Sequence, residues 1–366
     1  MLDTFPRRWM SEEEKEKDWS ELPAELIHLI AKKLPDLLNF IRFRAVCKTW
    51  HSSAPLSDPP CQLPWLLELF HPESTLERRQ RFFSISSGEI LTIPFTNRKP
   101  ELEKWIKGGV CNHYLAFADG NTMSFFNPLS KDLFSLPPMN SYLFLGSPCM
   151  VWTGTAPIRD RSILVLDRID SLRIKNICVR SFYDPHKSKW VDHFGRFDSC
   201  CYWQGLFFST CARGPTKVFD ACSKELLYTV LPPDSELTKN LYDGNEHDRY
   251  LEQSYLVVSS GTILRVSRFY SWCLQRSIFQ VYRLHYETAD GKPCWVQIND
   301  IGDQILFFEE MNGFSMTARP STGFRAGCIY FIDLDEEKPY MYDILAGTIG
   351  RVPCPFKTCT WFLPGL

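Results

Sequence analysis

Residues 22–50 read LPAELIHLIAKKLPDLLNFIRFRAVCKTW, and their apolar pattern sets them apart from the rest of the chain. Leucine or isoleucine stands at every fourth position of the first half, at Leu22, Leu26, Ile30 and Leu34. That spacing gives a helix one apolar face. Pro23 suits the first turn of such a helix, and Pro35 ends it because proline has no amide hydrogen to donate. The pattern predicts a short helix over residues 22–34.

Two further short helices are expected before residue 53. The apolar pattern restarts after Pro35, at Leu37, Leu38, Ile41 and Phe43. Residues 43–50 are expected to form the third helix, with Val46 and Trp50 four positions apart, before the prolines that follow break it. Three helices of about thirty residues bury too little apolar surface to be stable alone. Such a unit is expected to lay its apolar face into a groove on a partner.

The chain beyond Pro60 has the texture of a β domain. β-Branched and aromatic residues gather in short runs that Gly, Pro, Asn and Ser separate, which is typical of strands. Residues 255–258 and 262–266 are expected to form a hairpin through the turn 259–261. Other expected strands cover residues 89–93, 114–117, 162–166, 177–183, 278–284, 305–308 and 328–332.

A weak repeat marks several of the expected turns. In each copy an aromatic residue ends a strand, Asn or Asp starts a turn, and a large apolar residue opens the next strand. The copies are Phe126-Asn127 leading to Leu133, Tyr183-Asp184 leading to Trp190, Phe219-Asp220 leading to Leu226, and Tyr342-Asp343. Asn and Asp suit this place because their side chains accept hydrogen bonds from the backbone two residues on. At about 45 residues per blade, residues 61–366 would make a β-propeller of about six or seven blades. An irregular pair of β-sandwiches is the alternative.

The length of 366 residues favours one small module and one large domain over a single core. The expected fold class is mainly β with a small all-α N-terminal module. We predict a disordered charged tail over residues 1–17, a three-helix module over residues 18–58, and a β-propeller-like domain over residues 59–366.

Charge and cysteine content exclude several classes of protein. The 41 Lys and Arg are balanced by 43 Asp and Glu, so the chain is not a polycation and general nucleic-acid binding is disfavoured. Fourteen cysteines without a secretory leader fit a reducing compartment, so the nucleus and/or the cytoplasm is the expected location. The charge-free residues 133–158 contain four prolines, which argue against a membrane span.

The N-terminal pattern resembles the F-box. The resemblance rests on LPAEL at residues 22–26 and FRAVCKTW at residues 43–50. It implies that the helices bind a Skp1-type adaptor, which bridges to a cullin and its RING protein. The residues implied to form the adaptor-facing or supporting surface are Leu22, Pro23, Leu26, Ile30, Leu34, Val46 and Trp50.

The rest of the chain resembles plant F-box proteins with a KIB-type β-propeller, relatives of the F-box/kelch group. The phrases that carry this resemblance are FFNPLSKDLFSLPP at residues 125–138, GFRAGCIYFIDL at residues 323–334, and the closing WFLP at residues 361–364. The resemblance implies that the β domain holds a target protein.

Catalytic and metal-binding motifs are missing from the sequence. It contains no GxSxG elbow, no GxxxxGK[ST] phosphate loop, no HExxH helix and no CxxC pair. Apart from the adjacent Cys200 and Cys201, the closest cysteines are Cys354 and Cys359, with no second pair to complete a tetrahedral metal site. We therefore predict a non-catalytic protein without a cofactor or a metal.

Aromatic residues make up 14% of the chain, and some of them are expected on a face of the β domain. Aromatic side chains dominate the binding energy of many interfaces. Four that stand in polar, loop-like contexts are candidate target contacts, namely Trp152, Phe269, Tyr270 and Trp272.

The sequence predicts the substrate-recognition subunit of an SCF-type (Skp1–cullin–F-box) ubiquitin ligase. Such a subunit makes no bonds itself and instead holds a target near the ubiquitin carrier, which raises the effective concentration. One alternative is a propeller scaffold, bound to the adaptor or free, that acts outside ubiquitination. A propeller hydrolase is another, and it would require several carboxylates or histidines along a central channel.

Overall fold

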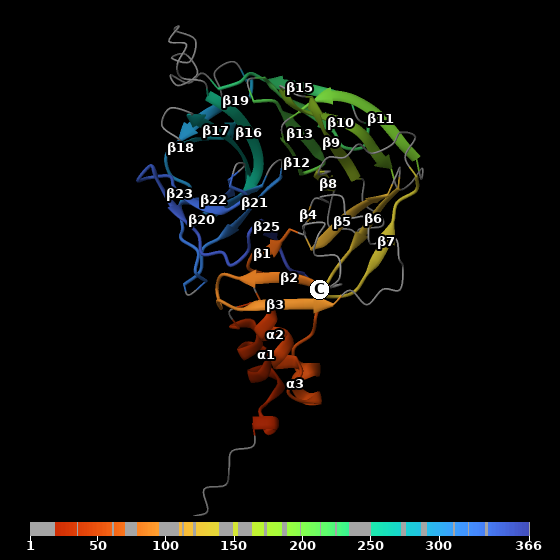
Figure 1. The fold of residues 1–366 in the computed structure, drawn as a ribbon, viewed down its shortest axis with the longest axis vertical. Helices are drawn as coiled ribbons and strands as arrows, with labels where there is room; N and C mark the ends of the chain where they lie inside the picture. The colour runs from red at the N-terminus through yellow and green to blue at the C-terminus, as the bar shows by residue number, and fades with distance from the viewer. Residues whose placement is uncertain are drawn as a thin grey trace, which may run out of the picture. The chain divides into compact units, whose positions relative to one another are not determined.

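The chain divides into two compact units, Met1–Gln62 and Leu63–Leu366, which we call the helical unit and the β unit (Figure 1). The predicted boundary lay at residue 58. The computed structural model describes residues 19–34, 36–60, 62–69, 79–94, 110–111, 113–119, 122–138, 149–152, 163–171, 174–184, 189–197, 199–212, 214–223, 225–233, 250–271, 276–286, 291–309, 312–320, 322–333 and 336–365. The predicted tail over residues 1–17 lies outside them.

The helical unit contains one short 3₁₀ turn, η1 (Trp19–Glu21), and the helices α1 (Ala24–Lys32), α2 (Leu37–Arg44) and α3 (Lys48–Ser53). Asp36 begins α2 because its carboxylate accepts a hydrogen bond from the backbone amide of Asn39 at 2.8 Å. None of the helices in the described part of the chain is long and apolar enough to cross a membrane.

The predicted start of the third helix was wrong. Phe43 and Arg44 complete α2, and the amide of Ala45 still bonds to the carbonyl of Ile41 at 3.2 Å. The backbone then becomes extended at Cys47, which precedes α3. The phrase FRAVCKTW therefore spans the end of one helix and the start of another.

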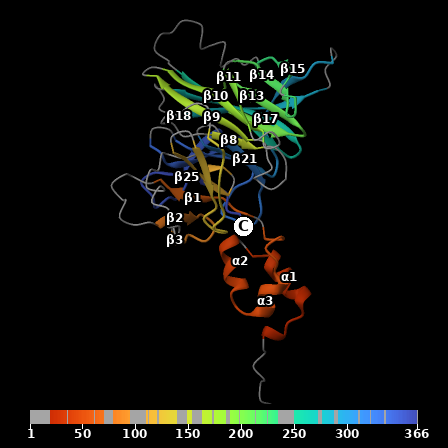
Figure 2. The same cartoon turned by 90° about the vertical axis from the view of Figure 1, so that its right-hand side faces the viewer.

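Six sheets make up the described part of the β unit (Figures 1 and 2). The first, which we call the closing sheet, joins β25 (Cys359–Phe362), β1 (Trp65–Glu68), β2 (Arg79–Ser84) and β3 (Ile90–Pro94) in that order. The second contains β4 (Val110–Cys111), β5 (Tyr114–Asp119), β6 (Thr122–Phe126) and β7 (Leu133–Ser135). The third contains β8 (Cys149–Trp152), β9 (Ile163–Ser171), β10 (Ile174–Asp184) and β11 (Lys189–Arg196).

The other three sheets follow in chain order. The fourth contains β12 (Ser199–Trp203), β13 (Leu206–Thr210), β14 (Thr216–Asp220) and β15 (Leu226–Val230). The fifth contains β16 (Tyr250–Ser259), β17 (Thr262–Ser271), β18 (Arg276–His285) and β19 (Cys294–Ile298). The sixth has the order β21 (Asn312–Thr317), β20 (Gln304–Glu309), β22 (Cys328–Ile332), β23 (Pro339–Asp343) and β24 (Thr348–Arg351).

The sheets follow one another around a common axis, which makes the β unit a β-propeller (Figure 1). The end strands β25, β4, β8, β12, β16 and β21 contact one another in this order, and β20 and β22 contact β25. The ring is closed by antiparallel pairing of β25 with β1, in which Leu66 lies opposite Trp361. The last strand of the chain thus shares a sheet with the first strands of the β unit.

The predicted blade count needs a correction. Five sheets are regular blades of four antiparallel strands, which is fewer than the six or seven blades predicted. The sixth sheet has five strands, and its β20 and β22 run parallel because β21 forms a hairpin with β20 before the chain enters β22. No seventh sheet is present among the described residues.

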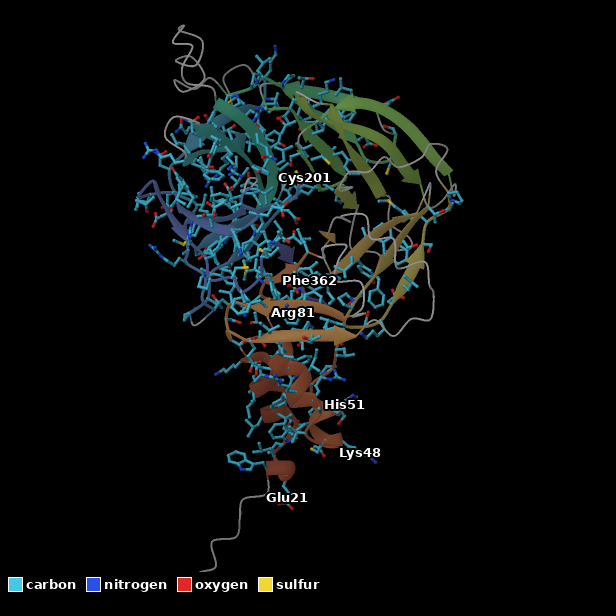
Figure 3. All side chains as sticks on the ribbon, viewed as in Figure 1. Glu21, Lys48, His51, Arg81, Cys201 and Phe362 are labelled. Carbon is cyan, nitrogen blue, oxygen red and sulfur yellow. The ribbon has the colours of Figure 1, made fainter. Side chains whose placement is uncertain are left out.

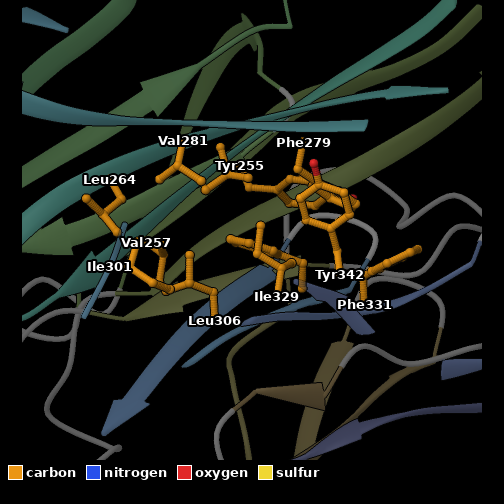
Figure 4. Close-up of a cluster of buried hydrophobic side chains, with 12 residues drawn as sticks. Tyr255, Val257, Leu264, Phe279, Val281, Ile301, Leu306, Ile329, Phe331 and Tyr342 are labelled. Carbon is orange, nitrogen blue, oxygen red and sulfur yellow. The ribbon is translucent and has the colours of Figure 1, made fainter. Parts of the chain in front are cut away.

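Aromatic and aliphatic side chains fill the spaces between neighbouring sheets. Between the fifth and sixth sheets, the rings of Tyr255 and Phe308 stack with their centroids 4.5 Å apart within a cluster of twelve buried residues (Figure 4). The cluster between the fourth and fifth sheets includes Phe208, Val218 and Leu256. Burying such faces against one another is the main force that holds the ring together.

The repeat seen in the sequence marks equivalent hairpins. Its aromatic and apolar members are cross-strand partners in the first three copies, as Phe126↔Leu133, Tyr183↔Trp190 and Phe219↔Leu226, and in the fourth copy Tyr342 pairs with Ile349. The side chains of Asn127, Asp220 and Asp343 each accept backbone hydrogen bonds across the turn, for example from Leu129 at 2.9 Å. The turn after Asp184 lies outside the described residues. The predicted hairpin and strands are confirmed, with ends that differ by a few residues.

Candidate functional site

Helix α1 carries an unpartnered apolar surface, which we call the open face. It consists of Leu26, Leu29 and Ile30, with 47%, 55% and 41% of their side chains exposed. Residues three and four apart lie on the same side of a helix, so these three form one surface. Ile27 and Ala31 on the other side are buried. The helix therefore uses one apolar side for its core and leaves the other open to solvent.

The predicted adaptor residues occupy different environments. Leu26 and Ile30 lie on the open face, Pro23 is exposed, and Val46 is 61% exposed after the end of α2. Leu22 and Leu34 are half-buried at the two ends of α1. Whether any of these residues contacts a partner stays a prediction.

Trp50 of α3 is half-buried and connects α3 to α2 and to the 3₁₀ turn η1. Its ring packs on Phe43 with centroids 4.3 Å apart, and its indole nitrogen donates a hydrogen bond to the carbonyl of Trp19 at 3.2 Å. Trp19 itself has 63% of its side chain exposed. Sequence reasoning missed both Trp19 and Leu29 as exposed apolar residues. The three-residue spacing from Leu26 to Leu29 was the signal that could have found the second.

Polar contacts hold α1 in place behind the open face. His28 and Lys32, one turn apart, both reach the carboxylate of Asp58, and Lys32 also donates to the carbonyl of Pro59 at 3.2 Å. The hydrogen bond from Lys32 is the main cause that lowers the pKa of Asp58. His28 additionally lies 3.2 Å from the carbonyl oxygen of Ser53 at the end of α3. These contacts fix the direction in which the open face points.

A second set of contacts joins α2 to α3. The guanidinium of Arg44 donates to the carbonyl of Ala54 at 2.7 Å and lies 3.0 Å from the ring nitrogen of His51, whose side chain Figure 3 labels. Its charge also lies 5.8 Å from the centre of the Phe40 ring. The three helices are therefore held together by a buried core and by side chains that hydrogen-bond to backbone carbonyls at the end of α3.

The predicted target contacts on the β unit need one correction. Phe269 is buried in β17, because this strand continues to Ser271 where the sequence suggested a loop. Tyr270 follows it on the opposite face of the strand and is partly exposed. Trp152 lies in β8, but its side chain is outside the described residues, as is all of Trp272.

Buried charges in the β unit serve to join sheets. Arg265 of β17 donates to the carbonyls of Gly214 and Ala212, in the turn that joins β13 to β14, at 3.0 and 2.8 Å. Arg268 reaches the carboxylate of Asp333, the residue after β22, at 2.9 Å and lies 4.7 Å from the centre of the Phe331 ring. Across the described ranges, no group of three or more His, Cys, Asp or Glu is arranged to hold a metal ion.

Comparison with known proteins gives matches along most of the chain. A family model described as the KIB1-4 β-propeller matches residues 82–348. An F-box/kelch-repeat protein of Arabidopsis thaliana is 21% identical over 330 residues, which cover 82% of this chain and 80% of that protein. A probable F-box protein of the same plant is 23% identical over 357 residues, which cover 89% of this chain and 92% of that protein.

One short match is much closer. Another Arabidopsis thaliana F-box protein is 57% identical over 37 residues, which make up 10% of this chain and 9% of that protein. Among solved structures, the N-terminal domain of Nup159 gives a TM-score of 0.34 at 11% identity, covering 77% of this chain and 87% of that chain. The structure of U3-55K gives a TM-score of 0.33 at 8% identity, covering 78% of this chain and 73% of that chain.

Proposed function

This chain belongs to the KIB1-4 β-propeller family, and from that premise we propose that it is the substrate-recognition subunit of an SCF-type ubiquitin ligase. Its relatives in Arabidopsis thaliana are F-box proteins, so the predicted resemblance to plant F-box proteins with such a propeller is confirmed. F-box proteins generally bind Skp1-type adaptors. The partner proposed for the helical unit is such an adaptor, and through it a cullin and a RING protein.

The open face is the observation that carries this proposal. Three large apolar side chains stay in water on a helix whose other side is buried. An amphipathic helix of this kind binds by laying its apolar side into a groove on a partner. We assign the contact to Leu26, Leu29 and Ile30 on the open face, with Leu22, Pro23, Leu34, Val46 and Trp50 around or behind them.

The β unit is proposed to hold the target. The ligase subunit then acts by proximity, because a bound target stays near the ubiquitin carrier and meets it at a high effective concentration. Trp152, Tyr270 and Trp272 remain proposed target contacts, and Phe269 is withdrawn because it is buried. The proposed location is the nucleus and/or the cytoplasm, and no catalytic step is assigned to this chain.

Co-expression with a Skp1-type adaptor tests the adaptor part of the proposal. The wild-type chain is expected to elute with the adaptor as a one-to-one complex on size-exclusion chromatography. The double substitution Leu26→Asp with Ile30→Asp places two charges in the contact and is expected to weaken binding at least about 100-fold, because buried unpaired charges are costly. Circular dichroism checks that the variant keeps its fold.

A matched control comes from the other unit. Leu345 and Ile349 of the sixth sheet are also exposed apolar residues, at 85% and 38%. Changing both to Asp is expected to leave adaptor binding unchanged. Equal binding by the open-face variant and the wild type would refute the proposal. Recovery of a cullin from cell extract with the wild-type chain, but not with the open-face variant, tests the ubiquitin-ligase part separately.

A further inference from the structure

Two cysteines lie together where the ring closes, and the proposed function uses neither. The sulfur atoms of Cys354 and Cys359 are 3.6 Å apart. Cys354 is half-buried in the segment that leads from β24 to β25, and Cys359 is buried as the first residue of β25. Both are free thiols. Only four residues separate them, so a bond between the two sulfurs would close a small loop without joining distant parts of the chain.

The surroundings make the two thiols unlike each other. The hydrogen bond with Cys359 is the main cause that lowers the pKa of Cys354, and the cation of Lys338 acts in the same direction. The ammonium group of Lys338 is held nearby, because it donates to the carbonyl of Phe356 between the two cysteines. The same thiol contact, together with burial, raises the pKa of Cys359. Cys354 is therefore the more accessible and more readily ionised member of the pair.

We propose that Cys354 and Cys359 form a site of reversible oxidation by hydroperoxides, in which Cys354 reacts first and Cys359 resolves the product to a disulfide. The placement of a partly exposed thiol against a buried second thiol is that of a redox-sensitive pair. Neighbouring cysteines do not by themselves make such a site, because Cys200 and Cys201 are consecutive in β12 and their side chains point to opposite faces of the sheet.

The chemistry balances with hydrogen peroxide as the oxidant. The Cys354 thiolate attacks one peroxide oxygen, the O–O bond breaks, and the released hydroxide takes a proton to become water. The sulfur of Cys359 then attacks the sulfenic acid at Cys354, the S–O bond breaks as the S–S bond forms, and a second water leaves with the thiol proton. Two thiols lose two electrons and two protons, and one peroxide becomes two waters.

Cys354 and Cys359 lie beside the pairing that closes the ring, so their oxidation is expected to affect the stability of the β unit. Cys359 lies opposite Glu68 in the pairing of β25 with β1, and its amide bonds to the carbonyl of Glu337 at 3.4 Å. The preceding Thr358 bonds through its carbonyl to the amide of Leu69 at 3.1 Å. A disulfide would link β25 to the segment that precedes it. It is expected to raise the midpoint temperature for thermal unfolding of the β unit by a few degrees.

The chain offers a direct readout of the disulfide. Trypsin cleaves after Arg351 and Lys357, which separates residues 352–357 with Cys354 from residues 358–366 with Cys359. The full-length protein would be treated with hydrogen peroxide, its remaining thiols alkylated, and the non-reducing digest examined by mass spectrometry. The expected result is one linked species with the summed mass of the two peptides less two hydrogens, which disappears after treatment with dithiothreitol.

Single substitutions test the order of the two steps. In Cys359→Ser the sulfenic acid at Cys354 is expected to accumulate and to be trapped by dimedone, whereas in Cys354→Ser residue 359 is expected to stay unmodified. Cys222→Ser removes an exposed cysteine elsewhere and is expected to change neither the linked species nor its rate of formation. Formation of the linked species no faster than random pairing of Cys354 with Cys222, or equal labelling of Cys354 and Cys359, would overturn the proposal.

Discussion

One helix of the helical unit leaves a group of apolar side chains in water, whereas the largest aromatic groups of the β unit are enclosed between its sheets. On α1, Leu26, Leu29 and Ile30 stay largely exposed. In the β unit, the ring of Phe307 is fully buried and lies within 5.3 Å of four other aromatic rings. A small unit has too little interior to cover all its apolar residues, whereas six sheets in a ring provide interior between every pair of neighbours.

This difference shows which apolar residues report on function. Burial inside a large unit needs no partner to explain it, because the hydrophobic effect already accounts for it. Exposure of several apolar residues on one side of one helix does need an explanation, since it costs solubility and gains nothing for the fold. The open face therefore points to a binding partner, whereas the burial of Phe269 is explained by the fold alone.

The largest expected effect comes from removing a buried aromatic ring from the core of the β unit. Phe307→Ala is expected to lower the free energy of unfolding of the β unit by about 3–5 kcal/mol, because the substitution leaves a cavity among the surrounding rings. Denaturant unfolding followed by tryptophan fluorescence measures this. Adaptor binding by the helical unit should stay unchanged. A loss below about 1 kcal/mol would mean that this core is less tightly packed than the structure indicates.

Two neighbouring residues on α1 allow the buried and the exposed side of one helix to be compared directly. Ile27 is fully buried and Leu26 is half-exposed, although they are adjacent in sequence. Ile27→Ala is expected to destabilise the protein by about 2–5 kcal/mol, whereas Leu26→Ala should cost no more than about 0.5 kcal/mol while weakening adaptor binding. Thermal unfolding by circular dichroism and a binding titration separate the two effects. Equal destabilisation by both changes would contradict the assigned faces of the helix.

Close packing near the C-terminus predicts a smaller effect. A Cβ atom on Gly365 would lie 2.4 Å from the ring of His113, while the carbonyl of Gly365 accepts a hydrogen bond from the side chain of Asn127 at 3.0 Å. Gly365→Ala is therefore expected to cost about 1–3 kcal/mol through overpacking. Gly350→Ala is the matched control, because its Cβ would meet Met341 at an ordinary 3.6 Å. Similar melting temperatures for the two variants would rule out this packing.

The smallest expected effect concerns the charges behind the open face. The pKa of Asp58 is lowered by its hydrogen bond with Lys32, so the carboxylate stabilises the fold above its ordinary pKa, and this contribution is lost as the pH falls through the lower folded value. Asp58→Asn should melt slightly below the wild type at pH 7, and the difference should shrink as the pH falls below the ordinary carboxyl pKa. A difference that grows as the pH falls below the ordinary carboxyl pKa would have the wrong sign for this contact.

Local patterns predicted much of the fold because they act within a few residues. Asn127 and Asp220 revealed their turns since a short polar side chain bonds to the backbone next to it. The strand Cys328–Ile332 was predicted with the observed ends, because its apolar run stops where the turn begins. These signals depend on nearby atoms, and no distant partner needs to be known to read them.

Pairings between distant residues could not be predicted from the sequence. The parallel contact of β20 with β22 depends on where β21 folds back, which no residue in β20 signals. The exposure of Leu29 and the burial of Phe269 likewise depend on what the rest of the unit covers. For the candidate site, the sequence indicated the helix and most of its apolar residues but not the division between its inner and outer sides.

The join between β25 and β1 has a consequence for how the protein is made. The residues that flank this join, such as Leu69 and Thr358, are 289 residues apart, and the later one is synthesised after the strands of the other five sheets. Loop-closure entropy grows only with the logarithm of length, so the separation itself is a modest cost. Timing is the greater constraint: domains made early in synthesis can fold early. The helical unit leaves the ribosome while the ring still lacks its final strand, and a nascent chain that stopped before β25 would expose the open face beside an unclosed ring.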